Sequence, residues 1–497
     1  MRLLVSLLLA LFFTGCATLP PGSAISPEAF DDDARRCLDM FNEADRRVET
    51  HQVRDAGATP VEGFPWLRTD RFLASFGNAL DGDDERWRAW LNHLRRTDLV
   101  ARRYELANAS GAHPFGQTVE DELDALDGCT RVLNDALLAN DALRDALLPR
   151  VEVPDDYRTW QRWLGLYPLT RVFVLAGVHR LHADKAETLV APPAAADDTR
   201  WRSYASAARI ADTPARLASA RRDALGIPEP EPRDLDGLLD RHAPVWRIET
   251  RSDDDRPGRP VWRTPERPEV RTDEPVEYRF VTWTRFDGQV LAQLNYLIWY
   301  PARSPEGRFD IFAGHMDGTL WRVTLDADGE PLAGESLHAC GCYYLVFPGE
   351  RLTEREPQPG GEPVFIGEPL PQTGPNTRLR LTRAAANHYL VHLDTIKRDV
   401  ADDASIRLPV TDADRLRSLA HPDGRRSLYR PDDGLVPGTA RPERWLLWPM
   451  GVPSAGAMRQ PGRHAIAFAS RRHFDAPELL AAHFQRTEAA NDTRNRR

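Results

Sequence analysis

The spacing of apolar residues changes partway along this 497-residue chain, and the change restricts its fold class. From residue 28 to about residue 225, apolar side chains recur at helical spacing. From Trp262 onward the period is two, and in the run Val290–Tyr300 both faces are largely apolar, which is typical of a central strand. The sequence therefore predicts an α+β fold, in which an N-terminal helical domain precedes a mainly antiparallel β-sheet domain.

Proline and charge content indicate where the domains meet. Residues 226–262 contain the stretches GIPEPEPRD and RSDDDRPGRP, whose composition disfavours regular structure. We therefore expect a helical domain over 28–225, a linker over 226–262 and a β-rich domain over 263–487, followed by a frayed tail over 488–497. A chain of this length can bury two or three separate cores.

Two local patterns make definite structural predictions. The apolar run Val172–Val178 is too short to span a bilayer, so we expect it to be the buried central helix of the helical domain. The tetrapeptide His315-Met316-Asp317-Gly318 contains an Asp-Gly pair. This pair predicts a hairpin turn between strands over 309–314 and 319–325.

The first residues are organised like a secretory signal. Arg2 precedes the apolar run Leu3–Phe13, whose length falls within the roughly 7–15 residues of such signals. The small residues Thr14 and Gly15 then lead directly to Cys16. The segment resembles the signal of a bacterial lipoprotein, and this resemblance implies removal of residues 1–15 and acylation of Cys16, for example by palmitate.

The same resemblance implies a location. Ala17, rather than Asp, follows the cysteine, and in Gram-negative lipoproteins this favours the outer membrane. We therefore expect a protein anchored by lipid to the periplasmic face of the outer membrane, because the several acyl chains of this class give stable attachment. Residues 16–27 are small, polar and proline-rich, and are expected to form a tether.

Charge and missing motifs limit the function classes. The net charge of −10 argues against nucleic acid as a partner, because binding a polyanion requires a basic surface. It is also expected to repel anionic lipid headgroups, so that attachment would depend on the acyl chains. The G-x-S-x-G, H-E-x-x-H and P-loop motifs are absent from the sequence.

Cys37 and Cys129 each lie on the apolar face of a predicted helix. The periplasm is oxidising, so we predict a disulfide between them that joins two helices of the helical domain. In the chain-entropy model such a bridge contributes about 4 kcal/mol. A pair of buried free thiols is the alternative.

The segment His338-Ala339-Cys340-Gly341-Cys342 is the most distinctive local motif. In a strand, predicted here over 338–347, the histidine and both cysteines would share one face. Three interpretations remain open: a structural role, a redox pair, or a site for Cu or Zn with His338 or His315 as a further ligand. Because the ends of this motif would lie about 13 Å apart in a straight strand, all three side chains could bind one ion only if the strand bends.

Basic residues gather near the C-terminus, on both sides of an apolar strand predicted over 465–470. They are Arg459, Arg463, His464, Arg471 and Arg472. Such a cluster could bind a phosphate or carboxylate group of an envelope glycan or lipid, and salt bridges within the protein are the alternative. His388 and His392 lie in an alternating stretch and are expected to be ordinary histidines on the polar face of a strand.

These observations favour a non-enzymatic binding or assembly role in the cell envelope, with an envelope protein or a glycan as partner and no required cofactor. The first alternative is a metal-binding or thiol-redox protein that uses His338, Cys340 and Cys342. A glycan hydrolase with two carboxylates is the second, because such sites leave no local motif.

Overall fold

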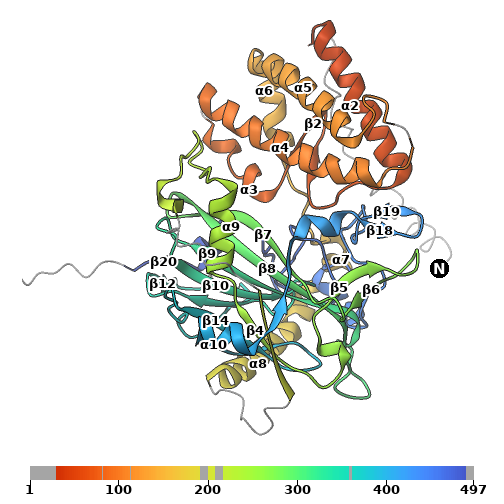
Figure 1. Cartoon of the computed structure of the whole chain (residues 1–497). Helices are drawn as coiled ribbons and strands as arrows, with labels where there is room; N and C mark the ends of the chain where they lie inside the picture. Colours follow the sequence, from red (N-terminus) through yellow and green to blue (C-terminus); the bar gives the residue numbers. More distant parts are fainter. Residues whose placement is uncertain are drawn as a thin grey trace, which may run out of the picture.

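The computed structural model describes residues 30–80, 82–111, 113–190, 200–206, 216–357 and 361–487. The expected signal segment, the tether with Cys16, and the tail over 488–497 lie outside the described residues. Helices dominate the N-terminal part, and mostly antiparallel strands follow (Figure 1). The predicted α+β class and the order of its two parts are therefore confirmed.

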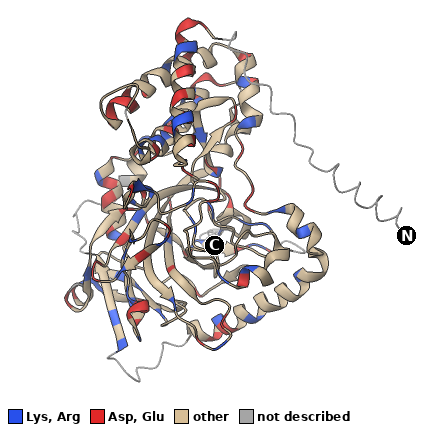
Figure 2. Ribbon diagram, turned by 90° about the vertical axis from the view of Figure 1, so that its right-hand side faces the viewer, with Lys and Arg blue, Asp and Glu red and all other residues tan. Residues whose placement is uncertain are grey.

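The N-terminal part is a helical bundle around a short hairpin. Its helices are α2 (Asp32–His51), α3 (Arg71–Ala74), α4 (Asp84–Asn108), α5 (Val119–Leu138) and α6 (Asp141–Leu147), and its strands are β1 (Thr59–Val61) and β2 (Phe64–Thr69). Asp31 caps α2 by accepting a hydrogen bond from Ala34 N, and Thr118 with Asp121 forms a capping box on α5. Inside the bundle, Arg68 Nη1 lies 2.6 Å from Glu105 Oε1. Over its surface, acidic and basic residues are interspersed (Figure 2).

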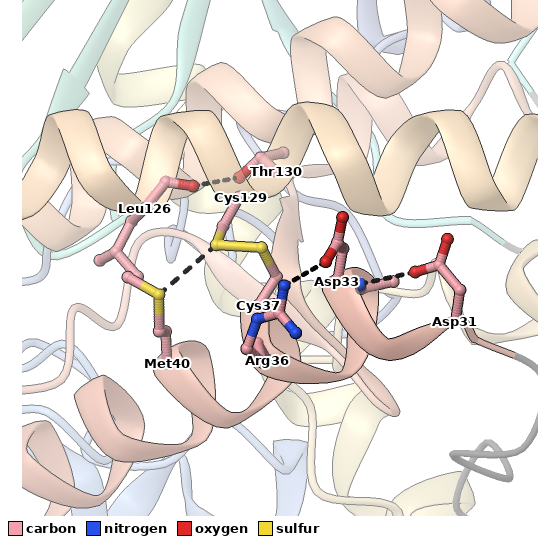
Figure 3. The surroundings of a disulfide bond; sticks show 9 residues. Asp31, Asp33, Arg36, Cys37, Met40, Leu126, Cys129 and Thr130 are labelled. Carbon is pink, nitrogen blue, oxygen red and sulfur yellow. Dashed lines mark hydrogen bonds and ion pairs between the residues drawn. A yellow bond between two sulfur atoms is a disulfide. The ribbon is translucent and has the colours of Figure 1, made fainter.

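The predicted disulfide joins two of these helices. Cys37 on α2 and Cys129 on α5 are bonded, with their Cα atoms 5.1 Å apart (Figure 3). Both residues are buried, and Cys129 Sγ also contacts Met40 Sδ at 3.5 Å. The bridge therefore crosses the core of the bundle between elements that are 92 residues apart in the chain.

The C-terminal part contains two packed sheets. The seven-stranded sheet has the order β13-β11-β10-β9-β8-β7-β17, and the five-stranded sheet has the order β15-β14-β4-β3-β16. One apolar core lies between the sheets, where Trp246 and Leu381 of the smaller sheet pack with Tyr296 and Trp321 of the larger one. A second core lies between the larger sheet and the C-terminal segments, including Leu428 and Phe474.

The strands of the larger sheet are β7 (Glu277–Phe286), β8 (Gln289–Arg303), β9 (Gly314–Leu325), β10 (Pro331–His338), β11 (Leu345–Pro348), β13 (Phe365–Ile366) and β17 (Val410–Asp412). Those of the smaller sheet are β3 (Trp201–Ser206), β4 (Val245–Glu249), β14 (Thr377–Arg383), β15 (Leu390–Lys397) and β16 (Ile406–Leu408). Three short pairs are β5 (Arg259–Trp262) with β6 (Pro268–Arg271), β12 (Leu352–Glu354) with β20 (Phe484–Arg486), and β18 (Leu419–His421) with β19 (Gly424–Arg426).

Further helices accompany the sheets. They are α7 (Thr159–Leu164), α8 (Tyr167–Val190), α9 (Pro232–Arg241), α10 (Arg398–Ala404), α11 (Glu443–Leu446) and α12 (Leu479–His483). The expected linker contains α9 and β4, because α9 has an apolar face that buries Leu238 and Leu239 despite the surrounding prolines and charges. Within the region expected to be helical, residues 201–206 form β3, which pairs with β4 and β16.

The prediction of a buried helix over Val172–Val178 is wrong. This run belongs to α8, which lies on the outside of the β-rich part at the lower edge of Figure 1, and Phe173 is 80% exposed. An apolar run alone does not distinguish a core helix from a helix that presents its side chains outward. No helix among the described residues combines the length and the apolar character needed to cross a bilayer.

The predicted turn at 315–318 is also wrong. These residues lie within β9, where Asp317 pairs with Tyr300 and Gly318 with Trp299 of β8. The glycine serves close packing instead of a turn, because a Cβ atom at position 318 would lie 2.9 Å from Ala339 Cβ and 3.0 Å from the Trp299 ring. Asp317 is consequently buried in the sheet and is not exposed at a loop tip.

Candidate functional site

The cysteine motif forms a tight turn after the end of a strand. β10 ends at His338, and strand structure resumes only at Leu345, so the predicted continuous strand over 338–347 is wrong. His338 N donates to Cys342 O at 3.0 Å, and Gly341 has φ +92°, a conformation that glycine adopts without strain. In this turn His338, Cys340 and Cys342 do not lie on one face of a strand, as the predicted metal or redox site requires.

Cys340 and Cys342 are buried free thiols in this turn. The Cys340 side chain and burial together raise the pKa of Cys342 well above its usual value, and this favours the thiol over the reactive thiolate. His315 lies elsewhere, with Nε2 2.6 Å from Pro268 O. Among the residues that the structure describes, no three His, Cys, Asp or Glu side chains come close enough to share a metal ion.

The C-terminal basic residues bind other parts of the protein. Arg459 and His464 are buried against the cysteine turn, with Arg459 Nε 3.2 Å from Cys340 O and His464 Nε2 3.0 Å from Ala339 O. Arg463 pairs with Asp156 at 2.9 Å, Arg471 with Asp155 at 2.5 Å, and Arg472 Nη2 donates to Glu362 O at 2.7 Å. The segment 465–470 between them is irregular, with a single bridge from Ala465 to His473. Arg463 and Arg471 thus form salt bridges within the protein, whereas Arg459, His464 and Arg472 contact backbone carbonyl groups.

A different set of polar residues meets at one end of the seven-stranded sheet. The end of β8, the start of β9 and the end of β10 lie side by side there, and the connection between β14 and β15 covers them. We call this set the Asp317 cluster. Its members are Lys185, Asp255, Tyr300, Arg303, Asp317, His338, Tyr343, His388, Tyr389, Arg441 and Glu443.

A carboxylate and two imidazoles form the centre of the cluster. Asp317 Oδ2 lies 2.8 Å from His388 Nδ1, and Asp317 Oδ1 lies 3.5 Å from His338 Nδ1. Burial alone would raise the pKa of Asp317, but His338 and His388 hold it well below its usual value. The central carboxylate is therefore ionised although it is shielded from water.

His388 lies between an aromatic ring and two carboxylates. Its ring stacks on Tyr300 at 3.8 Å between centroids, and its Nε2 lies 3.6 Å from Asp255 Oδ1. Burial lowers the pKa of His388, but Asp255 and Asp317 outweigh this effect and raise it. The two carboxylates therefore favour the protonated form of this histidine.

His338 has the opposite character. Burial lowers its pKa to about 4, although Asp317 partly offsets the effect. Its Nε2 is buried and finds no hydrogen-bond partner among the described residues. The pKa values of the two imidazoles on this carboxylate are thus shifted in opposite directions, and each imidazole has a buried Nε2 that makes no hydrogen bond with the described residues.

Two cations pack against the tyrosine rings of the cluster. Arg303 donates to Tyr343 Oη at 3.3 Å and to Tyr389 Oη at 3.2 Å, and Lys185 Nζ lies 3.7 Å from the centre of the Tyr389 ring. Arg303 and Lys185 are both buried, and neither forms an ion pair with a carboxylate of the described residues. Burial, and next the charge of Arg303, lower the pKa of Lys185 to about 8.

Glu443 and Arg441 complete the site from the C-terminal side. Burial raises the pKa of Glu443 to about 7, although Arg303 and Arg441 act against this shift. Arg441 Nη2 donates to Met316 O at 2.6 Å. Gly456 leaves room for the acidic side chain, because a Cβ atom at position 456 would lie 1.9 Å from Glu443 Oε1.

The backbone around the cluster is strained. Met316, Tyr343, Ala386 and His388 all have positive φ values, between 47° and 64°, which non-glycine residues rarely adopt. Ala386 N is held in this conformation by a 2.6 Å hydrogen bond to Asp255 Oδ1. Such strain concentrates at functional sites because the surrounding structure must compensate for it.

Chemically, the cluster can attract an anion through its unpaired cations and exchange a proton through His338 or Glu443. Of the predicted site residues, only His338 belongs to it. The sequence interpretation assigned Asp317 to a turn and His388 to a polar strand face, and did not consider Arg303, Tyr343 or Tyr389. The repeated aromatic and basic residues near 300, 343 and 389 are visible in the sequence, but no local motif connects them. Comparison of the chain with family models, with curated proteins and with solved structures finds no match.

Proposed function

We propose that this protein is a lipid-anchored component of the cell envelope that binds a phosphate-bearing ligand at the Asp317 cluster. Arg303 and Lys185 carry the proposal, because they are buried cations without a carboxylate partner among the described residues. Buried charges in folded proteins are normally paired. Two neighbouring cations that lack such partners favour a ligand with two negative charges.

Some other buried arginines pair with a carboxylate, whereas Arg383 and Arg459 donate to backbone carbonyl groups and have no carboxylate partner among the described residues. Arg322 pairs with Glu335 at 2.5 Å, and Arg279 pairs with Glu277 at 2.7 Å. The chain has 75 acidic residues for 65 basic ones, so partners are plentiful. The hydroxyl groups of Tyr343 and Tyr389 accept hydrogen bonds from Arg303 and also hydrogen-bond with each other, so one hydroxyl proton of the pair is left for a ligand oxygen.

Sulfate, which does not titrate in the relevant pH range, is a suitable probe. We expect it to raise the melting temperature of the wild-type protein through binding to the folded state. Arg303→Met should weaken this binding by about 30-fold or more, because a charge-assisted contact in a buried site is lost. The variant itself should melt no lower than wild type, since an unpaired buried charge is removed.

The matched control is Arg308→Gln, which removes an exposed arginine from the β8–β9 connection that follows Arg303. It should respond to sulfate like wild type, and general salt effects should appear equally in all three proteins. An equal response of Arg303→Met and wild type would contradict the proposed site. Acetate, a monoanion, should stabilise the wild type less than sulfate does.

Binding should also depend on pH. Lys185, with a pKa of about 8, loses its charge as the pH rises through that value, and Glu443, with a pKa of about 7, gains a negative charge beside Arg303. Both changes weaken attraction for an anion, so sulfate affinity should fall between pH 6 and pH 9. Calorimetric titration measures this, and Lys185→Met should lose the upper part of the dependence.

Lipid anchoring has its own test. The proposal rests on the resemblance of the first residues to a lipoprotein signal that ends at Cys16. A Cys16→Ala variant should fail to mature, and its processed form should be missing from the detergent phase after Triton X-114 partitioning. Normal processing and unchanged partitioning of the variant would exclude acylation at this residue.

A further inference from the structure

Large apolar side chains are exposed together on one side of the β-rich part. The most prominent are Trp163, Leu166, Leu169, Phe173, Trp445 and Leu446, which we call the apolar face. Trp163 is 79% exposed and Phe173 is 80% exposed. Soluble proteins rarely expose such a group of large side chains unless the surface binds something.

These side chains belong to one rigid surface. α7 and α8 both pack on the short helix η8 (Trp448–Met450), which follows α11 directly, and the rings of Trp160 and Trp448 are 5.7 Å apart. Arg162 Nε donates to Met450 O at 2.7 Å, and Tyr167 Oη donates to Ala469 O at 2.5 Å. The apolar face is therefore held on an ordered base, and its longest helix, α8, lies at the lower edge of the molecule, away from the helical bundle (Figure 1).

The net charge of residues 157–183, which contain α7 and most of α8, differs in sign from that of the whole chain. Although the net charge is −10, no acidic residue occurs in the sequence between Asp156 and Asp184, whereas four arginines do. Arg158 and Arg180 are exposed within this segment, and Arg444 lies beside Trp445 on α11. An apolar surface bordered by cations and rich in tryptophan has the chemistry of a membrane-interface binding element.

We propose that the apolar face binds the surface of a bilayer containing anionic phospholipid. Trp163, Phe173 and Trp445 would enter the interface between headgroups and acyl chains, while Arg158 and Arg180 would contact phosphate groups. A second copy of the chain is a poorer occupant, because a symmetric contact would bring the same arginines toward each other. The proposal differs from the expectation that the acidic chain is repelled by anionic lipid, because no acidic residue lies between Asp156 and Asp184.

The inference is independent of the Asp317 cluster and of acylation. Its test uses the chain that begins at Ala17, which retains every described residue and lacks the acylation site. Sedimentation with vesicles compares phosphatidylcholine alone with a mixture of phosphatidylcholine and phosphatidylglycerol. We expect binding to the mixed vesicles and a blue shift of tryptophan emission on binding.

Two double variants test whether the apolar face is responsible for binding to the mixed vesicles. Trp163→Ser with Phe173→Ser should weaken binding to mixed vesicles about tenfold or more, because two interfacial side chains are lost. Val400→Ser with Ile406→Ser changes exposed apolar residues on α10 and β16, and should bind like the unchanged chain. Circular dichroism should show that both variants are folded, as the substituted side chains are exposed.

Three results would overturn the proposal. The first is no binding to mixed vesicles, and the second is equal binding to both vesicle compositions. The third is a concentration-dependent dimer in solution that the Trp163→Ser/Phe173→Ser variant abolishes, because the face would then bind a second copy. None of these results would bear on sulfate binding at the Asp317 cluster, which Arg303→Met tests separately.

Discussion

Replacing Asp317 with asparagine is expected to lower the free energy of unfolding by about 3 kcal/mol, because it removes a buried carboxylate that favours the protonated form of His388 and is its closest partner. Asp255 remains near the other ring nitrogen at 3.6 Å, too far to replace the 2.8 Å contact. Urea denaturation of both proteins measures the difference.

The loss should depend on pH in a defined direction. The pKa of Asp317 is lowered in the folded state. Its contribution to the free energy of unfolding is therefore present when the pH is above the usual pKa of an aspartate, and it disappears as the pH falls through the folded-state pKa. The pKa of His388 is raised, so its contribution is full below about pH 6.5 and disappears as the pH rises through the folded-state value. The decrease in the free energy of unfolding caused by Asp317→Asn should therefore be largest between about pH 4 and pH 6.5.

Asp328→Asn provides the control for this variant. Asp328 lies in the turn between β9 and β10, is about half exposed, and pairs with Arg351 on the surface. Its substitution should change stability by less than about 1 kcal/mol. A similarly small effect at Asp317, with no pH dependence, would show that the central charge pair contributes little.

The second large effect concerns the disulfide. A Cys37→Ala/Cys129→Ala variant is expected to lose about 4 kcal/mol of stability, because opening a 92-residue loop increases the entropy of the unfolded chain. Wild-type protein in reducing agent should approach the same stability. Urea denaturation followed by far-ultraviolet circular dichroism reports on the helical bundle directly.

Cys340→Ser provides the comparison, since this buried thiol is free. Its effect should come from packing alone and should be the same with and without reductant. If reductant leaves the wild type unchanged, or if non-reduced peptide mapping recovers both Cys37 and Cys129 as free thiols, the bridge is not part of the protein.

The parts of the fold that could be predicted depend on local periodicity. Helical spacing and alternation are properties of neighbouring residues, and they identified the two halves of the chain and the faces on which Cys37 and Cys129 lie. The failures at Val172–Val178 and Asp317-Gly318 share a cause. Each pattern is compatible with two environments, and only the distant packing partners, such as Trp299 and Ala339 around Gly318, select one of them.

The Asp317 cluster could not be assembled from the sequence for the same reason. His388 has positive φ in the connection between β14 and β15, so strand alternation did not describe where its side chain points. Its contacts with Tyr300 and Asp317 join residues more than 70 positions apart, and the unpaired state of Arg303 and Lys185 is a property of the assembled site. By contrast, predicting the disulfide required only that the apolar faces of two helices were assigned correctly.

Locating a heavy tetrahedral anion in crystals of the protein tests the anion site most directly. Crystals soaked in tungstate would be measured at the tungsten absorption edge, where anomalous scattering identifies the ion. The account predicts an anomalous peak within hydrogen-bond distance of Arg303 and Lys185, with the hydroxyl groups of Tyr343 and Tyr389 turned toward it. A soaked crystal with no peak at these residues, or with peaks only at other arginines such as Arg471 and Arg472, would contradict it.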